Sequence, residues 1–384
     1  MSFDLTALLG FAKDQGASDL HISAGMPPML RLHGEMVKLE LPALTREEAH
    51  AALYDILQDD QKRHFEEHRE LDFALEIPGL SRFRANLLMQ LRGDAAVFRL
   101  VPTQVKTLEQ LGMPDVLRQL CEKERGLVVV TGPTGSGKST TLAAMVNYVN
   151  ENHRGHIVTV EDPIEFVHEP KKCLINQREV GPHTRSFQNA LRAALREDPD
   201  VILVGELRDL ETTQLAISAA ETGHLVFATL HTNSAAKAID RIIDIFPTGQ
   251  QAQIRTMLSE SLEGVVAQML LPTKDGKGRA AAIEVLVGVP ALRNLIREDK
   301  TAQILSVIQT GSVHGMRSLD QSLRDLVMQG KLSKSEAMKH ASHPNLFENA
   351  AAQAPGTPGS ATSAGPSRPA AAAESSKKPG LFSR

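Results

Sequence analysis

Residues 128–141 read VVVTGPTGSGKSTT, and this stretch decides the fold. It contains the pattern G-x-x-x-x-G-K-[ST], filled by Gly132, Gly137, Lys138 and Ser139. The apolar run before the glycines predicts a short buried strand, and the residues after them predict a helix with one apolar face. A strand, a glycine-rich loop and a helix form the context in which this pattern binds phosphate. The alternative is a glycine-rich turn with a chance lysine, and both pattern and context argue against it.

These residue types suit phosphate for physical reasons. Glycine has no Cβ, so the backbone can curl closely around a phosphate. Inward-pointing amides and the N-terminus of the following helix supply positive potential. We expect Lys138 to reach the β- and γ-phosphates of ATP and Ser139 to coordinate Mg²⁺. The predicted ATP-binding residues of the loop are Gly132, Pro133, Thr134, Gly135, Ser136, Gly137, Lys138, Ser139 and Thr140.

The composition is that of an ordinary globular protein. The 384 residues are 42% hydrophobic and 23% charged, with a formal net charge of −4. This charge, and the low aromatic content without tryptophan, do not indicate a nucleic-acid binder. Two distant cysteines argue for a reducing compartment and against a metal framework. The N-terminus predicts an amphipathic helix rather than a signal peptide, and no apolar run is long enough for a bilayer. We therefore expect a cytosolic protein, or one peripheral on the cytosolic face of a membrane.

The first part of the chain predicts a small domain. Residues 1–100 alternate between strand-like and helical patterns, which predicts an α+β fold. Thr45 and Glu48 occupy the N-cap and capping-box positions of one predicted helix. The stretches SRFRANLLMQL and AAVFRLVP predict strands. Residues 101–115 are bracketed by prolines and are expected to form a linker.

The second part predicts a larger α/β domain, expected over residues 116–347. Up to about residue 247, buried strands alternate with helices, which predicts a parallel sheet. After about residue 250 the pattern predicts mostly helices. Residues 348–384 are rich in Ala, Pro, Ser and Gly and have few large apolar side chains. They predict a disordered tail, because they cannot form a core.

Acidic residues follow two of the predicted strands. Glu206 ends the stretch VILVGE, at the second acidic position of a Walker B motif, although Gly205 stands where an Asp is usual. The stretch HIVTVEDPIEF supplies Glu161, Asp162 and Glu165. In an open α/β sheet, ligands bind at the carboxyl ends of the strands. We expect Glu161 to polarise water and Glu206 to bind Mg²⁺, but the opposite assignment stays open. Asp162 is equally explained as the cap of a turn.

Two histidines, His224 and His231, bracket the predicted strand LVFATL. A histidine that ends a strand beside a nucleotide can sense the γ-phosphate or donate to it. A structural role is the alternative for each. Function is favoured for His231, and the two interpretations are balanced for His224. A zinc site is not indicated, because no cysteine or further histidine has ligand spacing.

Four stretches together resemble one family, the secretion ATPases of type II secretion, type IV secretion and type IV pili. They are GPTGSGKST, VEDPIEFVH, REDPDVILVGELRD and ETGHLVFATLHTNSAAKAIDRIIDIFP, which match its Walker A, Asp, Walker B and His boxes. The resemblance runs from the N-terminus to about residue 345. Within the family, ALRNLIRE at Ala291–Glu298 and GMRSLDQSL are similar to the pilus retraction motors. The chain departs from them at Leu292, where Ile is usual, and in its longer tail.

The resemblance implies a homohexameric ring of α/β subunits that hydrolyses ATP. Each subunit would have a PAS-like α+β domain followed by a RecA-like P-loop domain. Arginines of the first domain would reach the nucleotide, and Arg84 and Arg99 match the family best. A cation at the γ-phosphate stabilises the transition state and couples hydrolysis to domain position. Arg82 and Arg92 lie in the same stretch and are equally explained as solvated strand residues.

The resemblance also implies partners. They are the inner-membrane platform protein of the pilus and an accessory retraction paralogue, with no nucleic acid. The chain would work in the cytoplasm, peripherally at the cytosolic face of the inner membrane. Pilin disassembly and twitching motility would be the outcome.

The sequence leaves other functions as alternatives. An accessory retraction ATPase and an assembly ATPase belong to the same family. ALRNLIRE, and the lack of the tetracysteine insert of assembly ATPases, argue against assembly. A hexameric DNA translocase would need a basic pore, and a non-enzymatic scaffold would not need Lys138, Glu161 and Glu206. Within ALRNLIRE, Arg293 and Arg297 are like charges four residues apart, which predicts an acidic surface opposite them. The alternative is that this helix only packs its Leu/Ile face against the core and that its arginines have no special partner.

Overall fold

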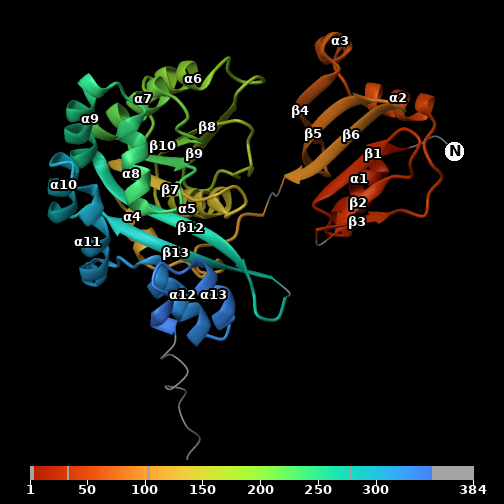
Figure 1. Ribbon diagram of the computed structural model, residues 1–384. Coiled ribbons are helices and arrows are strands. Elements are labelled where there is room, and N and C mark those ends of the chain that lie inside the picture. The colour runs from red at the N-terminus through yellow and green to blue at the C-terminus, as the bar shows by residue number, and fades with distance from the viewer. Residues whose placement is uncertain (1–3, 33, 102–103, 277, 348–384) are drawn as a thin grey trace, which may run out of the picture.

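The protein contains two β-sheets, each covered by helices, in a computed structural model (Figure 1). The structure describes residues 4–32, 34–101, 104–276 and 278–347. The predicted α/β class is confirmed: an antiparallel α+β part precedes a mainly parallel sheet. The tail predicted over 348–384 lies outside the described residues. None of the described helices is long and apolar enough to cross a bilayer.

The first sheet has six strands in the order β3-β2-β1-β6-β5-β4, and all neighbours are antiparallel. Its helices share one buried core with the sheet. The predicted capping box forms, with Thr45 Oγ1 accepting from Glu48 N and the Glu48 carboxylate accepting from Thr45 N. The elements are α1 (Leu5–Asp14), β1 (Asp19–Ser23), β2 (Met29–Leu32), β3 (Glu35–Lys38), α2 (Arg46–Asp55), α3 (Asp59–His68), β4 (Glu70–Ile77), β5 (Ser81–Gln90) and β6 (Gly93–Val101).

The alternation of side chains along β5 gives this sheet two different faces. Phe83, Ala85 and Leu87 point into the helix-covered core. Because successive strand residues point to opposite faces, Arg82 and Arg84 lie on the other face. That face is turned toward the second sheet, because Arg82 contacts Glu179 of β9 there.

The second sheet has seven strands in the order β13-β12-β7-β11-β10-β8-β9, and only β13 runs antiparallel to its neighbour. Short 3₁₀ helices lie at 301–303, 312–314 and 344–347. The other elements are α4 (Val116–Cys121), β7 (Gly126–Thr131), α5 (Lys138–Asn152), β8 (His156–Glu161), β9 (Leu174–Glu179), α6 (Phe187–Ala194), β10 (Val201–Val204), α7 (Leu210–Glu221), β11 (Leu225–Leu230), α8 (Ala235–Asp244), α9 (Thr248–Ser261), β12 (Leu262–Pro272), β13 (Arg279–Val287), α10 (Pro290–Arg297), α11 (Ile304–Thr310), α12 (Leu319–Met328) and α13 (Lys334–His340).

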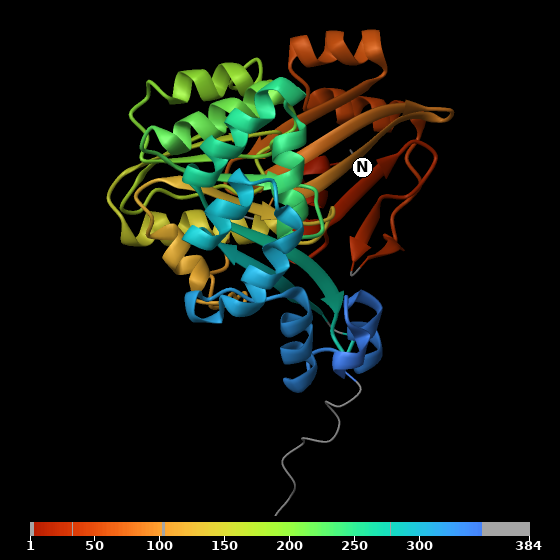
Figure 2. The same cartoon turned by 60° about the vertical axis from the view of Figure 1, so that its left-hand side comes forward.

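Helices cover both faces of this sheet, which explains why its strands are continuous apolar runs (Figure 2). In β7, Leu127 and Val129 join the core formed with α6 to α11. Val128 and Val130 join the core formed with α4 and α5. Every residue of β7 is therefore buried. This packing fixes the strand from which the glycine-rich loop leaves.

Helices predominate after residue 250, as expected, but the pattern missed β12 and β13, which are strands of 11 and 9 residues. β13 reads RAAAIEVLV, whose alanines favour a helix in isolation. Pairing with β12, which itself pairs with β7, overrides that preference. The hairpin also packs against α12 and α13, at the bottom of Figure 1.

Candidate functional site

The glycine-rich loop connects β7 to α5 and requires glycine at two positions where β12 presses against it. A Cβ on Gly132 would lie 2.2 Å from the carbonyl oxygen of Gln268. A Cβ on Gly137 would lie 2.7 Å from Nε2 in the side chain of the same residue, Gln268. Both glycines also have φ values in the left-handed region, 149° and 90°. Glycine is therefore needed at both positions because β12 approaches closely, as well as because the loop curves tightly.

Lys138 begins α5 and turns its side chain back over the loop. Its Nζ donates to the carbonyl oxygens of Gly132, at 2.9 Å, and Pro133, at 3.2 Å. Burial lowers the pKa of Lys138, while the carboxylates of Glu206 and Glu165 oppose that shift. A cation that is partly stripped of water and held over a nest of amides attracts an anion strongly.

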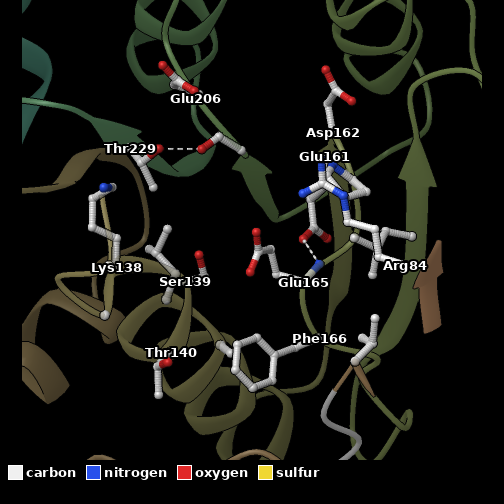
Figure 3. A pocket seen from close by; sticks show the side chains of 18 of the residues that line it. Arg84, Lys138, Ser139, Thr140, Glu161, Asp162, Glu165, Phe166, Glu206 and Thr229 are labelled. Carbon is white, nitrogen blue, oxygen red and sulfur yellow. Dashed lines mark hydrogen bonds between the residues drawn. The ribbon is translucent and has the colours of Figure 1, made fainter. Parts of the chain in front are cut away.

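Three predicted residues meet the loop at the carboxyl ends of neighbouring strands. Glu161 ends β8, Glu206 follows β10 and His231 follows β11. Parallel strands present these ends at one edge of the sheet, and all three residues line the same cavity of about 820 Å³ as the loop. Figure 3 shows Lys138 and Ser139 on one side of this cavity and Glu161 on the other.

A chain of polar contacts links the lysine to the acids. His231 Nδ1 lies 3.4 Å from Lys138 Nζ, and its Nε2 lies 3.3 Å from Glu206 Oε1. Arg208 donates from Nε to the other Glu206 oxygen at 2.7 Å, and its guanidinium lies 3.6 Å from Asp162. Glu206 is thus held between a histidine and an arginine.

Glu161 accepts more hydrogen bonds than Glu206 does. Its carboxylate accepts from Thr159 Oγ1 at 2.7 Å, from Gln177 Nε2 at 3.3 Å and from the Glu165 amide at 3.3 Å. Burial raises the pKa of Glu161, and these hydrogen bonds oppose the rise. A carboxylate with a raised pKa accepts a proton more readily, as a general base must.

The arginines of the first sheet reach the same cavity. Arg84 and Arg99 face each other across β5 and β6, and both line it. Arg99 donates to the buried carboxylate of Asp19 at 2.8 Å, whereas among the described residues no acid pairs with Arg84. Arg82 forms a 2.6 Å ion pair with Glu179 of β9 and is only 14% exposed. Its interpretation as a solvated strand residue is therefore wrong.

Most of the predicted site residues come together. The cavity is lined by Arg84, Arg99, Thr134, Gly135, Gly137, Lys138, Ser139, Thr140, Glu161, Glu206 and His231. Gly132, Pro133 and Ser136 complete the loop without being among the lining residues.

His224 is the exception. It precedes β11, at the opposite end of the strand from His231, and its Nδ1 lies 3.0 Å from the Ala219 carbonyl oxygen. Of the two interpretations weighed equally for His224, this position within the chain favours the structural one, because a strand length separates it from the loop.

Sequence reasoning missed several residues that line the cavity, among them Phe166, Phe187 and Arg208. Arg208 lies two residues after Glu206, which is the signal that could have identified it. The two aromatic residues gave no such signal, because their positions depend on how distant segments pack.

The loop suits a phosphate ligand on two observations of its own. Lys138 lines the cavity beside Gly135 and Gly137, whose positive φ values let the backbone curl around a phosphate. Within the described part of the chain, Ser136 Oγ is buried and has no hydrogen-bond partner. A buried hydroxyl without a partner is costly, and a ligand oxygen would satisfy it.

Comparison with known proteins gives a consistent result. A family model described as type II/IV secretion system protein matches residues 4–353. The chain is 57% identical over 344 residues to the type IV pilus retraction ATPase PilT of Pseudomonas aeruginosa, covering 90% of this chain and 100% of that relative. It is 41% identical over 338 residues to the type IV pilus ATPase PilU of the same organism, covering 88% of each.

A solved structure shares the fold. It is the crystal structure of the pilus retraction motor PilT with bound ADP, with a TM-score of 0.85 and 46% sequence identity. The match covers 90% of this chain and 99% of that chain, so the similarity includes both sheets.

Proposed function

This chain belongs to the type II/IV secretion system protein family, and from that membership we propose that it is an ATP-driven motor that retracts type IV pili. It is an ATPase of that family. One observation carries the proposal: the phosphate loop, the acids at the strand ends and the arginines of the first sheet line a single cavity.

The loop residues 132–140 would bind the phosphates of ATP. Backbone amides and Lys138 would neutralise the β- and γ-phosphates. Ser139 and Glu206 would hold Mg²⁺, which neutralises phosphate charge when it is bound. The position of Glu206 at the end of β10, across the cavity from the loop, supports this assignment.

Glu161 would act on the attacking water. Its raised pKa and its fixed orientation both suit a base that takes a proton as the water attacks phosphorus. Glu206 is held by His231 and Arg208 instead, which suits a residue that responds to the phosphate. His231 would then sense the γ-phosphate through its contacts with Lys138 and Glu206.

Arg84 and Arg99 would couple hydrolysis to movement. They belong to the first sheet, so a contact with the γ-phosphate would depend on where that sheet lies. Loss of the γ-phosphate would release them and let the two parts of the chain move. Around a ring of six copies, such movements would act on the platform protein at the cytosolic face of the inner membrane.

We propose a domain division to match. Residues 1–100 would form a PAS-like domain, 101–115 a linker and 116–347 a RecA-like ATPase domain. Two separate sheets with separate cores support this division.

The alternatives are weaker. The strongest alternative is an accessory motor of the PilU type. The higher identity to PilT, 57% against 41%, favours a PilT-type retraction motor. A pilus assembly motor would share the site but act in the opposite direction. For a DNA translocase, the net charge of −4 offers no support.

The experiment measures ATPase activity against protein concentration, with the mass of the oligomer determined at each concentration. Turnover per subunit should rise as the chain assembles into hexamers, and Lys138→Ala should lose nucleotide affinity. Full turnover in a monomer would contradict the proposed motor. Activity that appears only with DNA and falls with salt would favour the translocase instead.

A further inference from the structure

Gln268 of β12 lies behind the phosphate loop, outside the nucleotide cavity, and is 5% exposed. Its carboxamide makes two hydrogen bonds of 2.7 Å. Nε2 donates to the carbonyl oxygen of Ser136, and Oε1 accepts from Thr141 Oγ1. One side chain of a neighbouring strand therefore joins the loop to the first turns of α5.

The bond to Ser136 fixes the orientation of one peptide group. The peptide between Ser136 and Gly137 is planar and trans, so its carbonyl and its N–H point in opposite directions. The carbonyl points outward to Gln268. The N–H of Gly137 must therefore point toward the inner side of the loop, where a phosphate would lie.

The backbone of the same residue constrains the other end of the loop. The Gln268 carbonyl oxygen lies so close to Gly132 that any Cβ there would overlap it, and its Nε2 does the same at Gly137. β12 thus presses on both glycine positions that define the motif pattern. Because the carboxamide must donate on one side and accept on the other, an apolar side chain of the same size cannot replace it.

We propose that Gln268 is a positioning residue for nucleotide binding, which holds the Ser136–Gly137 peptide so that the Gly137 amide faces the phosphate. The inference rests on the nucleotide site proposed above and not on the direction in which the motor works. It concerns binding rather than chemistry, because the amide would contact a phosphate in the ground state and in the transition state alike.

The test replaces Gln268 by methionine, which has a similar length and no hydrogen-bond donor. ADP affinity of the full chain is measured by calorimetry, and steady-state kinetics give KM and kcat for ATP. Gln268→Met should weaken ADP binding about tenfold, because a bond to a charged phosphate is lost. KM should rise by a similar factor while kcat changes little, as expected when uniform binding is removed.

Two further variants separate positioning from stability. Thr141→Val removes only the other bond of the carboxamide and should weaken ADP binding less than Gln268→Met does. Asn150→Leu is the matched control: Asn150 is also buried, and its amide also bonds to backbone groups, but at the far end of α5. It should lower the melting temperature and leave ADP affinity unchanged.

Parent-like ADP affinity in folded Gln268→Met would overturn the inference. So would an equal loss in Asn150→Leu, since the effect would then follow stability alone. If the parent chain binds no ADP, the proposed nucleotide site itself is wrong. If the parent and Gln268→Met bind ADP equally well, only the inference about Gln268 is wrong.

Discussion

His168 shows how burial controls a single charge beside the cavity. It is 9% exposed, and burial, with a contribution from the Lys171 ammonium, lowers its pKa to about 4. The unfolded chain takes up the proton near pH 6.5, whereas the folded chain does so only near pH 4. Between these values the unfolded state binds more protons, so stability falls as the pH falls.

We predict that the free energy of unfolding falls by about 2 kcal/mol, through this histidine alone, when the pH is lowered from 7 to 5. Chemical denaturation at several pH values measures the change. His168→Gln should flatten the curve over this range. An unchanged curve in His168→Gln would place the acid sensitivity elsewhere.

Arg84 and Arg99 both line the cavity, but only Arg99 also forms an ion pair, with Asp19, among the described residues. Arg84→Ala should lower ATP turnover roughly tenfold or more and leave folding and ADP binding nearly intact. Arg99→Ala should also lower turnover. It should cost about 1–2 kcal/mol of unfolding free energy as well, because the buried Asp19 carboxylate loses one of its hydrogen-bond donors and keeps Ser18. Turnover assays and denaturation of both variants decide the matter, and normal turnover in both would remove these arginines from the mechanism.

At the scale of elements, the contact between α9 and α10 explains the arginines of ALRNLIRE. Arg293 donates to the carbonyl oxygens of Ser259 and Glu260, at the end of α9, and pairs with Glu263 at 2.7 Å. Arg297 donates to Ser259 Oγ at 3.2 Å. The predicted acid therefore lies within the chain for Arg293, whereas Arg297 forms no ion pair among the described residues. Arg293 caps α9, whose last carbonyl groups would otherwise lack donors.

Arg293→Ala should consequently lower the unfolding free energy by about 2 kcal/mol, because two carbonyl groups and Glu263 lose their partner. Arg297→Ala should cost less, since it gives up fewer contacts with α9. Denaturation gives both values, and ATPase activity of the folded variants should stay near that of the parent. A stable Arg293→Ala chain that hydrolyses ATP but no longer supports motility would instead assign this arginine to an external partner.

Sequence patterns predicted those elements whose local signals agree with their surroundings. The strand, loop and helix around Lys138 and the capping box of α2 are local, so their residues could be identified directly. β13 could not, because its alanines favour a helix and only pairing with β12 makes it a strand. Gln268 and Glu179 gave no signal either, since their partners Ser136 and Arg82 lie 132 and 97 residues away in the chain.

At the scale of the whole molecule, the two sheets meet through a buried ion pair. Arg82 of β5 contacts Glu179 of β9 at 2.6 Å, and Glu179 also accepts from the amide of Ile164 at 3.0 Å. Ile164 lies in the segment between Glu161 and Glu165. The position of the first sheet is therefore connected to the segment that carries the proposed base. This contact, with Arg84 and Arg99, gives the proposed motor a physical link from phosphate to domain position.

The most direct test of the central claim is the number of pili per cell in a strain whose only copy carries Glu206→Gln. The purified variant should still bind ATP and hydrolyse it roughly a hundredfold more slowly, because the carboxylate proposed to hold Mg²⁺ during the reaction is lost. Its cells should then carry abundant pili and show no surface motility, since pili would extend and not retract. Cells without pili would identify an extension motor, and parent-like pilus numbers with normal motility would contradict the assignment of the site.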